Sequence, residues 1–171
     1  MEDFSDKDPK DARYMRVALE EAKNAAANGE VPVGAVVVYQ DEIIGRGYNR
    51  REELCSALAH AELLAIEQAS RHLGSWRLCD CQLYVTLEPC VMCVGAIVQA
   101  RMGRLIFGCL DPKGGAVESL YQLCADARLN HRLPVAGGML AEDCSTILQA
   151  FFNRLRQNKR DQLKAERWPS G

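Results

Sequence analysis

The sequence predicts an α/β protein, a three-layer α/β/α sandwich built on a mixed five-stranded sheet. Short runs rich in β-branched residues alternate along the chain with segments whose apolar residues recur at helical spacing. This alternation is expected where helices cover both faces of a sheet. The chain has 171 residues, enough for one substantial core and too few to suggest a second. We therefore expect a single domain over residues 1–171.

The first half of the chain is expected to form a helix, a hairpin and a second helix. Apolar residues recur at helical spacing over residues 14–25, and Asn28-Gly29 provides a stop signal. Two β-branched runs, residues 31–39 and 43–48, flank a polar turn and predict a pair of strands. Residues 59–70 again show helical spacing. The acidic start, residues 1–10, is expected to be flexible.

The second half begins with a strand, helix, strand unit. Residues 83–87 and 104–108 are short apolar runs typical of strands. Between them, residues 91–100 are apolar nearly all round, which predicts a helix buried on every side. A unit of this kind makes part of the sheet parallel.

Three further elements are expected toward the C-terminus: a short helix at residues 119–124, an edge strand near residues 133–135, and a long basic helix at about 141–165. The long helix carries an apolar stripe at i, i+3, i+4 and i+7, made of Leu148, Phe151, Phe152 and Leu155. The excess of positive charge at its end is typical of a solvated surface helix or of a surface that contacts phosphates.

The composition is that of a soluble folded protein, with 48% hydrophobic residues, 26% charged residues and a net charge of -2. By itself it gives no sign of a nucleic-acid partner. No apolar run approaches the roughly 20 residues that span a membrane, and the acidic start lacks a secretory pattern, so we expect a cytoplasmic protein. The eight cysteines then indicate metal ligands or free thiols rather than disulfides.

Cys90 and Cys93 are the first candidate metal ligands. They follow a strand and Pro89, and they fall in the first turn of the predicted buried helix. Residues three apart lie on one face of a helix, so both sulfurs can reach one ion. The positive end of the helix dipole favours the thiolate form that a metal requires.

His60, at the start of the preceding helix, is expected to be the third ligand. Three protein ligands leave one tetrahedral position for water, which is typical of catalytic zinc, whereas structural zinc has four. Glu62 is interpreted as a carboxylate beside that water, able to act as general acid and base. A lone histidine or a lone Cys-x-x-Cys is usually structural, so the prediction depends on the whole set.

The remaining six cysteines have no partner at ligand spacing and are expected to be structural thiols. They are Cys55, Cys79, Cys81, Cys109, Cys124 and Cys144.

The segments His60-Ala61-Glu62 and Pro89-Cys90-Val91-Met92-Cys93 resemble the zinc-binding signature of the cytidine and deoxycytidylate deaminase superfamily. Residues 30–36, 84–93 and 107–113 further resemble the bacterial tRNA-specific adenosine deaminases. The likeness runs from the first helix to Phe151-Phe152. It implies the sandwich fold of the cytidine deaminase type and one Zn²⁺ per subunit.

The resemblance also implies a reaction and a set of contacts. The expected substrate is the wobble adenosine, position 34, in the anticodon stem-loop of an arginine tRNA, converted to inosine with loss of ammonia. Asn49 matches the asparagine that hydrogen-bonds the base, and Ala61 and Asp111 are further expected substrate contacts. Additional candidates are Lys113, His131 and Arg154. A loop histidine such as His131 is more often without a function.

The family works as a homodimer that builds its RNA groove from both subunits, and the apolar helix at residues 91–100 would fit such an interface. Two departures from the family pattern bear on substrate fit. Ser56-Ala57-Leu58 replaces a more polar segment, and Gly114-Gly115 is expected to loosen the loop after Asp111.

Two other functions stay open on the sequence. One is a deaminase of a free base or nucleoside, of the guanine or cytosine type. The other is a binding module that keeps the zinc fold without turnover, although Glu62 argues against it.

Overall fold

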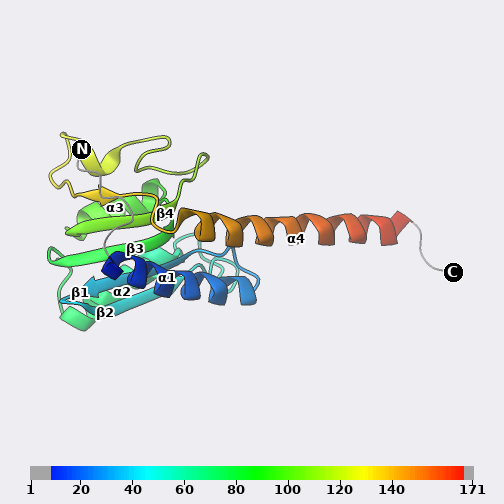
Figure 1. The fold of residues 1–171 in the computed structure, drawn as a ribbon, viewed down its shortest axis with the longest axis horizontal. Helices are drawn as coiled ribbons and strands as arrows, with labels where there is room; N and C mark the ends of the chain where they lie inside the picture. Colours follow the sequence, from blue (N-terminus) through cyan, green and yellow to red (C-terminus); the bar gives the residue numbers. More distant parts are fainter. Residues whose placement is uncertain (1–8, 168–171) are drawn as a thin grey trace.

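The computed structural model describes residues 9–167, with side chains to residue 163, and is built around one mixed five-stranded sheet (Figure 1). The strand order is β2-β1-β3-β4-β5. β1 pairs antiparallel with β2 and β3, whereas β4 is parallel to β3 and β5. The predicted mixed sheet is therefore confirmed. Its strands are β1 (Gly34–Tyr39), β2 (Glu42–Tyr48), β3 (Cys81–Leu87), β4 (Arg104–Cys109) and β5 (Val135–Ala136).

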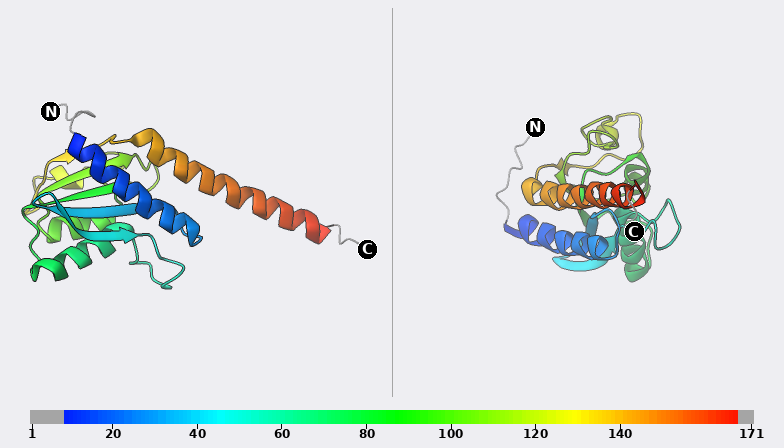
Figure 2. Two further views of the ribbon diagram at one scale, coloured as in Figure 1. Left: turned by 60° about the horizontal axis from the view of Figure 1, so that its bottom comes forward. Right: turned by 90° about the vertical axis from the view of Figure 1, so that its right-hand side faces the viewer.

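Helices cover both faces of the sheet, which confirms the three-layer sandwich (Figures 1 and 2). Within the described residues, α1 (Pro9–Ala27) and α4 (Ala141–Arg167) pack on one face, and α2 (Ala61–Leu73) and α3 (Val91–Gln99) pack on the other. Each face of the sheet has its own hydrophobic core, and side chains alternate between the two along β1. Val36 packs with α1 and α4, and Val37 packs with α2 and α3.

The expected flexible start lies mostly outside the described residues, which begin at Pro9. Pro9 and Lys10 themselves already belong to α1. Proline suits a first helical position because its missing N–H would have no partner there and its φ is already close to helical.

The helix at residues 91–100 is not buried on every side, contrary to the prediction. Cys93, Val94 and Ile97 face the core, but Val91 is 51% exposed and Gly95 is also exposed. The physical reason is that α3 lies on a single sheet face with α2 beside it, so the opposite side of the helix points outward.

The helix expected at residues 119–124 is also wrong. The structure has only a short 3₁₀ turn, η1 (Leu123–Ala125). The backbone N–H groups of Glu118 and Ser119 donate to the Glu88 carboxylate, at 2.7 and 2.8 Å. These N–H groups therefore bond to a side chain far away in the sequence, and the segment does not form the hydrogen bonds of an α-helix.

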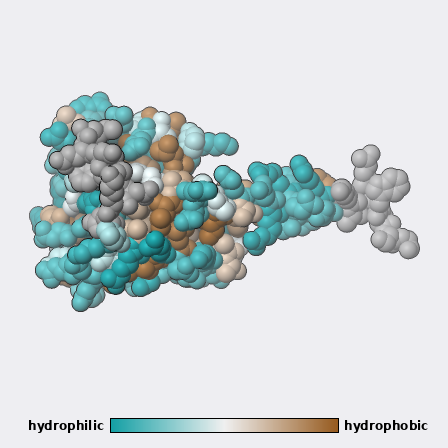
Figure 3. Space-filling model, viewed as in Figure 1, coloured by the Kyte–Doolittle hydropathy of each residue, from teal (hydrophilic) through white to brown (hydrophobic). Residues whose placement is uncertain are grey.

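α4 begins against the sheet and then projects well beyond it (Figures 1 and 2). Phe151 is buried, but Phe152 and Leu155 of the predicted stripe are 41% and 48% exposed. The projecting part of the helix is largely hydrophilic in Figure 3. Among the described residues, no helix has both the length and the apolar character needed to cross a membrane.

Close contact between β2 and α2 fixes the edge of the sheet next to the candidate site. A Cβ added at Gly45 would lie 2.3 Å from the Ala65 carbonyl oxygen, and one at Gly47 would lie 2.2 Å from that of Ala61. Only glycine permits so close an approach of strand and helix. The start of α2, and with it His60, is thereby held beside the end of β2.

We expect Gly45→Ala to lower the free energy of unfolding by about 2–3 kcal/mol, because the added methyl group would push the α2 backbone off the sheet. Gly74→Ala provides a matched control. Gly74 ends α2 with φ 61 and nothing near its Cβ position, so its cost is only the left-handed conformation, about 1 kcal/mol. Denaturant unfolding of both variants measures the difference. Equal losses would contradict the steric argument.

The six cysteines outside the candidate site fall into different environments. Cys81, Cys124 and Cys144 are buried, as expected of structural thiols. Cys55 and Cys79 are exposed and so are not core residues. Burial raises the pKa of Cys124 to about 11 and that of Cys144 to about 12.

These pKa values predict which thiols react with iodoacetamide at pH 8, since the thiolate is the nucleophile. Cys55 should be modified at least about 100-fold faster than Cys124 or Cys144, which are both protonated and shielded. Mass spectrometry of quenched time points measures the rates, and labelling in denaturant controls for intrinsic reactivity. Labelling of Cys144 at the rate of Cys55 in the native protein would contradict the prediction.

Candidate active site

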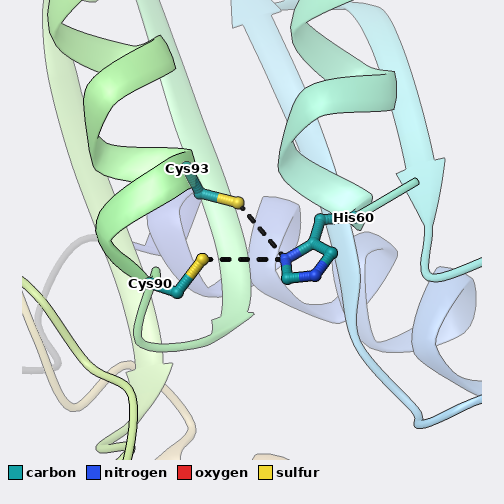
Figure 4. A group of neighbouring side chains, drawn as sticks. All are labelled: His60, Cys90 and Cys93. Atoms are coloured by element: carbon teal, nitrogen blue, oxygen red, sulfur yellow. Dashed lines mark hydrogen bonds between the residues drawn. The ribbon is translucent and has the colours of Figure 1, made fainter. Parts of the chain in front are cut away.

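His60, Cys90 and Cys93 come together at the edge of the sheet where α2 and α3 both begin (Figure 4). His60 is the N-cap of α2, and Cys90 is the N-cap of α3. Neither side chain makes the usual capping hydrogen bond to its own helix. The three side chains face one another: His60 Nδ1 lies 3.5 Å from Cys93 Sγ and 3.8 Å from Cys90 Sγ.

The spacing of these three donor atoms fits one tetrahedral metal ion. All three lie within 4.8 Å of one another. Sulfur and nitrogen ligands about 2.0–2.3 Å from a tetrahedral zinc ion are roughly 3.5–3.8 Å apart, which matches the distances in the cluster. Within the described residues, it is the one such group of three or more histidine, cysteine or carboxylate side chains. A tetrahedral ion held by these three residues would have one coordination position left for a non-protein ligand.

The electrostatics of the cluster also suit a cation. Hydrogen bonds from Cys93 and then His60 lower the pKa of Cys90 to about 3. The hydrogen bond to Cys90, together with burial, raises the pKa of Cys93, and the hydrogen bond with Cys90 raises the pKa of His60. The cluster thus contains a thiolate at the positive end of a helix dipole, and a second thiol whose proton a metal ion can replace.

Glu62 lies beside the cluster, although it is only two residues from His60. In mid-helix the two side chains would point to opposite sides, but His60 precedes the helix and Glu62 is in its first turn. Both therefore line one cavity. Glu62 is 4% exposed, and burial raises the pKa of its carboxyl group.

The cavity has a volume of about 130 Å³ and contains most of the predicted site. Its polar wall includes Asn49 from the end of β2 and Asp111 from the loop after β4, and its apolar wall includes Val31, Val33 and Leu87. The predicted residues that line it are His60, Cys90, Glu62, Asn49, Ala61 and Asp111.

Three predicted contact residues lie outside this cavity. Lys113 is exposed, and its N–H donates to Asp111 Oδ1 at 3.0 Å. His131 lines a separate surface hollow, and its Nε2 is 2.9 Å from the Met102 carbonyl oxygen. Arg154 is exposed on α4.

Sequence reasoning missed two charged residues of the cavity, Arg51 and Glu88. Arg51 is close enough to His60 for its charge to oppose protonation of the imidazole. Glu88 is buried, which favours the neutral acid, but hydrogen bonds from Ser119 and from the N–H groups of Glu118, Ser119 and Asp111 outweigh burial and lower its pKa to about 2. The only sequence signal for Glu88 was its place directly before Pro89-Cys90.

The loop after Asp111 is not loosened by Gly114-Gly115, contrary to the prediction. The Gly115 N–H donates to the Asp111 carbonyl oxygen at 2.9 Å, and Gly115 forms a bridge with Cys90. A Cβ at Gly115 would lie 2.2 Å from the Glu88 carboxylate. Gly115 is therefore required for close packing of the loop against the site.

Comparison with known proteins agrees with the geometry. The family model of MafB19-like deaminases matches residues 9–156. The chain is 50% identical over 147 residues to a tRNA-specific adenosine deaminase of Streptococcus pyogenes serotype M1, covering 86% of each chain. It is 49% identical over 150 residues to that of Bacillus subtilis (strain 168), covering 88% of this chain and 93% of the relative.

A solved structure from a study of A-to-I editing by tRNA:A34 deaminases at the wobble position superposes with a TM-score of 0.77. It is 44% identical and covers 80% of this chain and 99% of that chain. Sequence identity near one half over most of the chain, the shared fold and the cluster of His60, Cys90 and Cys93 lead to one conclusion. The chain belongs to the tRNA-specific adenosine deaminase family.

Proposed function

We propose that this chain is a zinc-dependent hydrolase that converts adenosine to inosine at the wobble position of tRNA, in an arginine tRNA. One observation carries the proposal: a single cavity joins the metal cluster, a buried glutamate and the amide of Asn49. Family membership selects adenosine in tRNA from the substrates that such a cavity could hold.

His60, Cys90 and Cys93 would hold one zinc ion per subunit. Two sulfur ligands and one imidazole favour zinc over the harder cations, which prefer oxygen. Bound there, zinc supplies Lewis acidity and makes a water molecule more acidic. The protein provides the thiolate at Cys90, stabilised at the start of α3, and keeps the three donors at ligand spacing.

Glu62 is the residue we assign to proton transfer. Replacement of the adenine amino group by water consumes H₂O and releases NH₃, so protons must pass from water to a ring nitrogen and to the departing amine. Glu62 lines the cavity beside the cluster and is shielded from solvent. Glu88 lines the same cavity, but its two oxygens already accept five hydrogen bonds.

Asn49, Ala61 and Asp111 are the proposed contacts for the nucleotide. The Asn49 amide can donate to and accept from the edge of a purine, and the small side chain of Ala61 leaves room for a flat ring. Asp111 comes from the loop on the other side of the cavity. Extrusion of a base from an anticodon loop is easier than from a duplex, because the loop is already single-stranded.

Contacts beyond the base are assigned to outer surfaces of the molecule. Arg154 lies on the projecting, hydrophilic α4, where positive charge can contact phosphates (Figure 3). We assign Lys113 and His131 to the same tRNA surface. We also propose a homodimer in which a second copy covers the exposed apolar side of α3 around Val91. One domain over residues 1–171 and a cytoplasmic location complete the proposal.

The substrate is tested with a synthetic anticodon stem-loop carrying adenosine at the wobble position, assayed for inosine. Free adenosine, guanine and cytidine are assayed beside it for inosine, xanthine and uridine. We expect turnover on the stem-loop and none on the free compounds, since only the stem-loop offers phosphates and a positioned base. A stem-loop with guanosine at the wobble position controls for non-specific hydrolysis. Turnover confined to free guanine or a free nucleoside would keep the metal chemistry and overturn the RNA substrate.

The two roles at the centre of the site are separated by a pair of variants. Glu62→Gln should retain one zinc per chain but lose kcat by about 10²–10⁴-fold, since the amide cannot accept a proton. Cys90→Ala should lose zinc and be less stable, because ligand binding contributes to folding. Metal analysis and stem-loop kinetics on the same samples measure both. A Glu62→Gln rate near that of the wild type would refute the proton-transfer role.

A further inference from the structure

Glu88 is buried between the metal cluster and the loop formed by residues 111–119, here called the 111–119 loop. It is 2% exposed and lies two residues before Cys90. Its own N–H donates to the Cys109 carbonyl oxygen at 2.9 Å, so its backbone is tied to the end of β4. The sheet therefore fixes the backbone of Glu88 independently of the loop.

Within the described part of the chain, all five hydrogen bonds to the Glu88 side chain come from the 111–119 loop. Oε1 accepts the N–H groups of Val117, Glu118 and Ser119, at 3.1, 2.7 and 2.8 Å. Oε2 accepts the N–H of Asp111 at 2.9 Å and the hydroxyl group of Ser119. One carboxylate thus ties both ends of the loop to the segment that precedes Cys90.

The loop is shaped to receive this carboxylate. Gly115 passes so close that a Cβ there would lie 2.2 Å from the carboxylate carbon. The backbone of Gly115 also forms a β-bridge with Cys90. Next to it, the Ala116 N–H donates to the Pro89 carbonyl oxygen at 2.8 Å. The same segment therefore supports Cys90 and, through Glu88, the backbone of Asp111.

We propose that Glu88 is a positioning residue, which fixes the 111–119 loop over the cavity and thereby holds Asp111 in place for the substrate. It does not take part in proton transfer, because its five hydrogen bonds use the acceptor capacity of both oxygens. Backbone N–H donors need an acceptor, so the amide nitrogen of a glutamine at this position cannot replace an oxygen. The inference rests on the proposed function only where it concerns the substrate.

The first test needs no substrate. In zinc-loaded Glu88→Gln, amide hydrogen exchange at residues 117–119 should be about tenfold faster or more than in the wild type, while exchange in β1 and β3 stays unchanged. Ser119→Ala removes a single donor and should give a smaller change in the same direction. Glu67→Gln, at an exposed carboxylate on α2, is the matched control. Unchanged exchange at residues 117–119 in Glu88→Gln would overturn the proposal.

The second test measures kinetics on the anticodon stem-loop. Glu88→Gln should raise KM by about tenfold or more with kcat within about threefold of the wild type and zinc content unchanged, because a positioning loop acts on binding. Asp111→Ala should also raise KM. The double variant should have a KM less than about threefold above that of the worse single variant, because both changes act on the same contact. If the two increases in KM multiply in the double variant, Glu88 does not act through Asp111. A loss of zinc that accounts for the lost activity would lead to the same conclusion.

The two proposals fail in different ways. If the wild type leaves the stem-loop unchanged, the proposed function is wrong, and hydrogen exchange alone then decides whether Glu88 holds the loop. If the wild type edits the stem-loop but the Glu88→Gln variant matches it in both tests, the function stands and the positioning role is refuted.

Discussion

The whole site depends on two helices that begin side by side at one edge of the sheet. α2 and α3 lie on the same face, and the residues at their N-caps are His60 and Cys90. An N-cap normally carries a serine, threonine, aspartate or asparagine that bonds back to its own helix. Here the cap side chains turn toward each other instead. The cost of two uncapped helix starts is offset by the Cys90 thiolate, whose negative charge lies near two positive helix ends.

Two buried glutamates line one cavity, and we assign them different roles because their hydrogen-bond partners differ. Glu62 and Glu88 are almost equally shielded from solvent, so burial alone would raise the pKa of both carboxyl groups. Glu88 is surrounded by donors from the 111–119 loop, and these keep it ionised. Glu62 faces a thiol and the cluster, and its pKa is raised. A carboxyl group that is satisfied on both oxygens holds structure, whereas one beside the cluster can exchange a proton.

The parts of the site that the sequence predicted are those with local causes. The spacing of Cys90 and Cys93 follows from one helical turn, and the strand, helix, strand unit makes β3 and β4 parallel neighbours. The role of Glu88 could not be predicted in this way, since its partners are 23 to 31 residues further along the chain. The same long-range bonds explain why residues 119–124 do not form the expected helix. Local propensity there gives way to a buried charge that needs donors.

The apolar stripe on α4 and the apolar helix α3 show a different kind of disagreement between sequence and structure. The pattern predicted burial all round for residues 91–100 and an apolar stripe that includes Phe152 and Leu155. One copy of the chain leaves Val91, Phe152 and Leu155 substantially exposed. An apolar stripe indicates that one side of a helix is buried. It does not show whether the chain's own core or a partner molecule covers that side. The proposed second copy would account for the excess on α3. On α4 the same apolar residues stand next to positive charge on a helix that extends beyond the sheet, so this helix has both the reach and the composition to contact a ligand much larger than a free base.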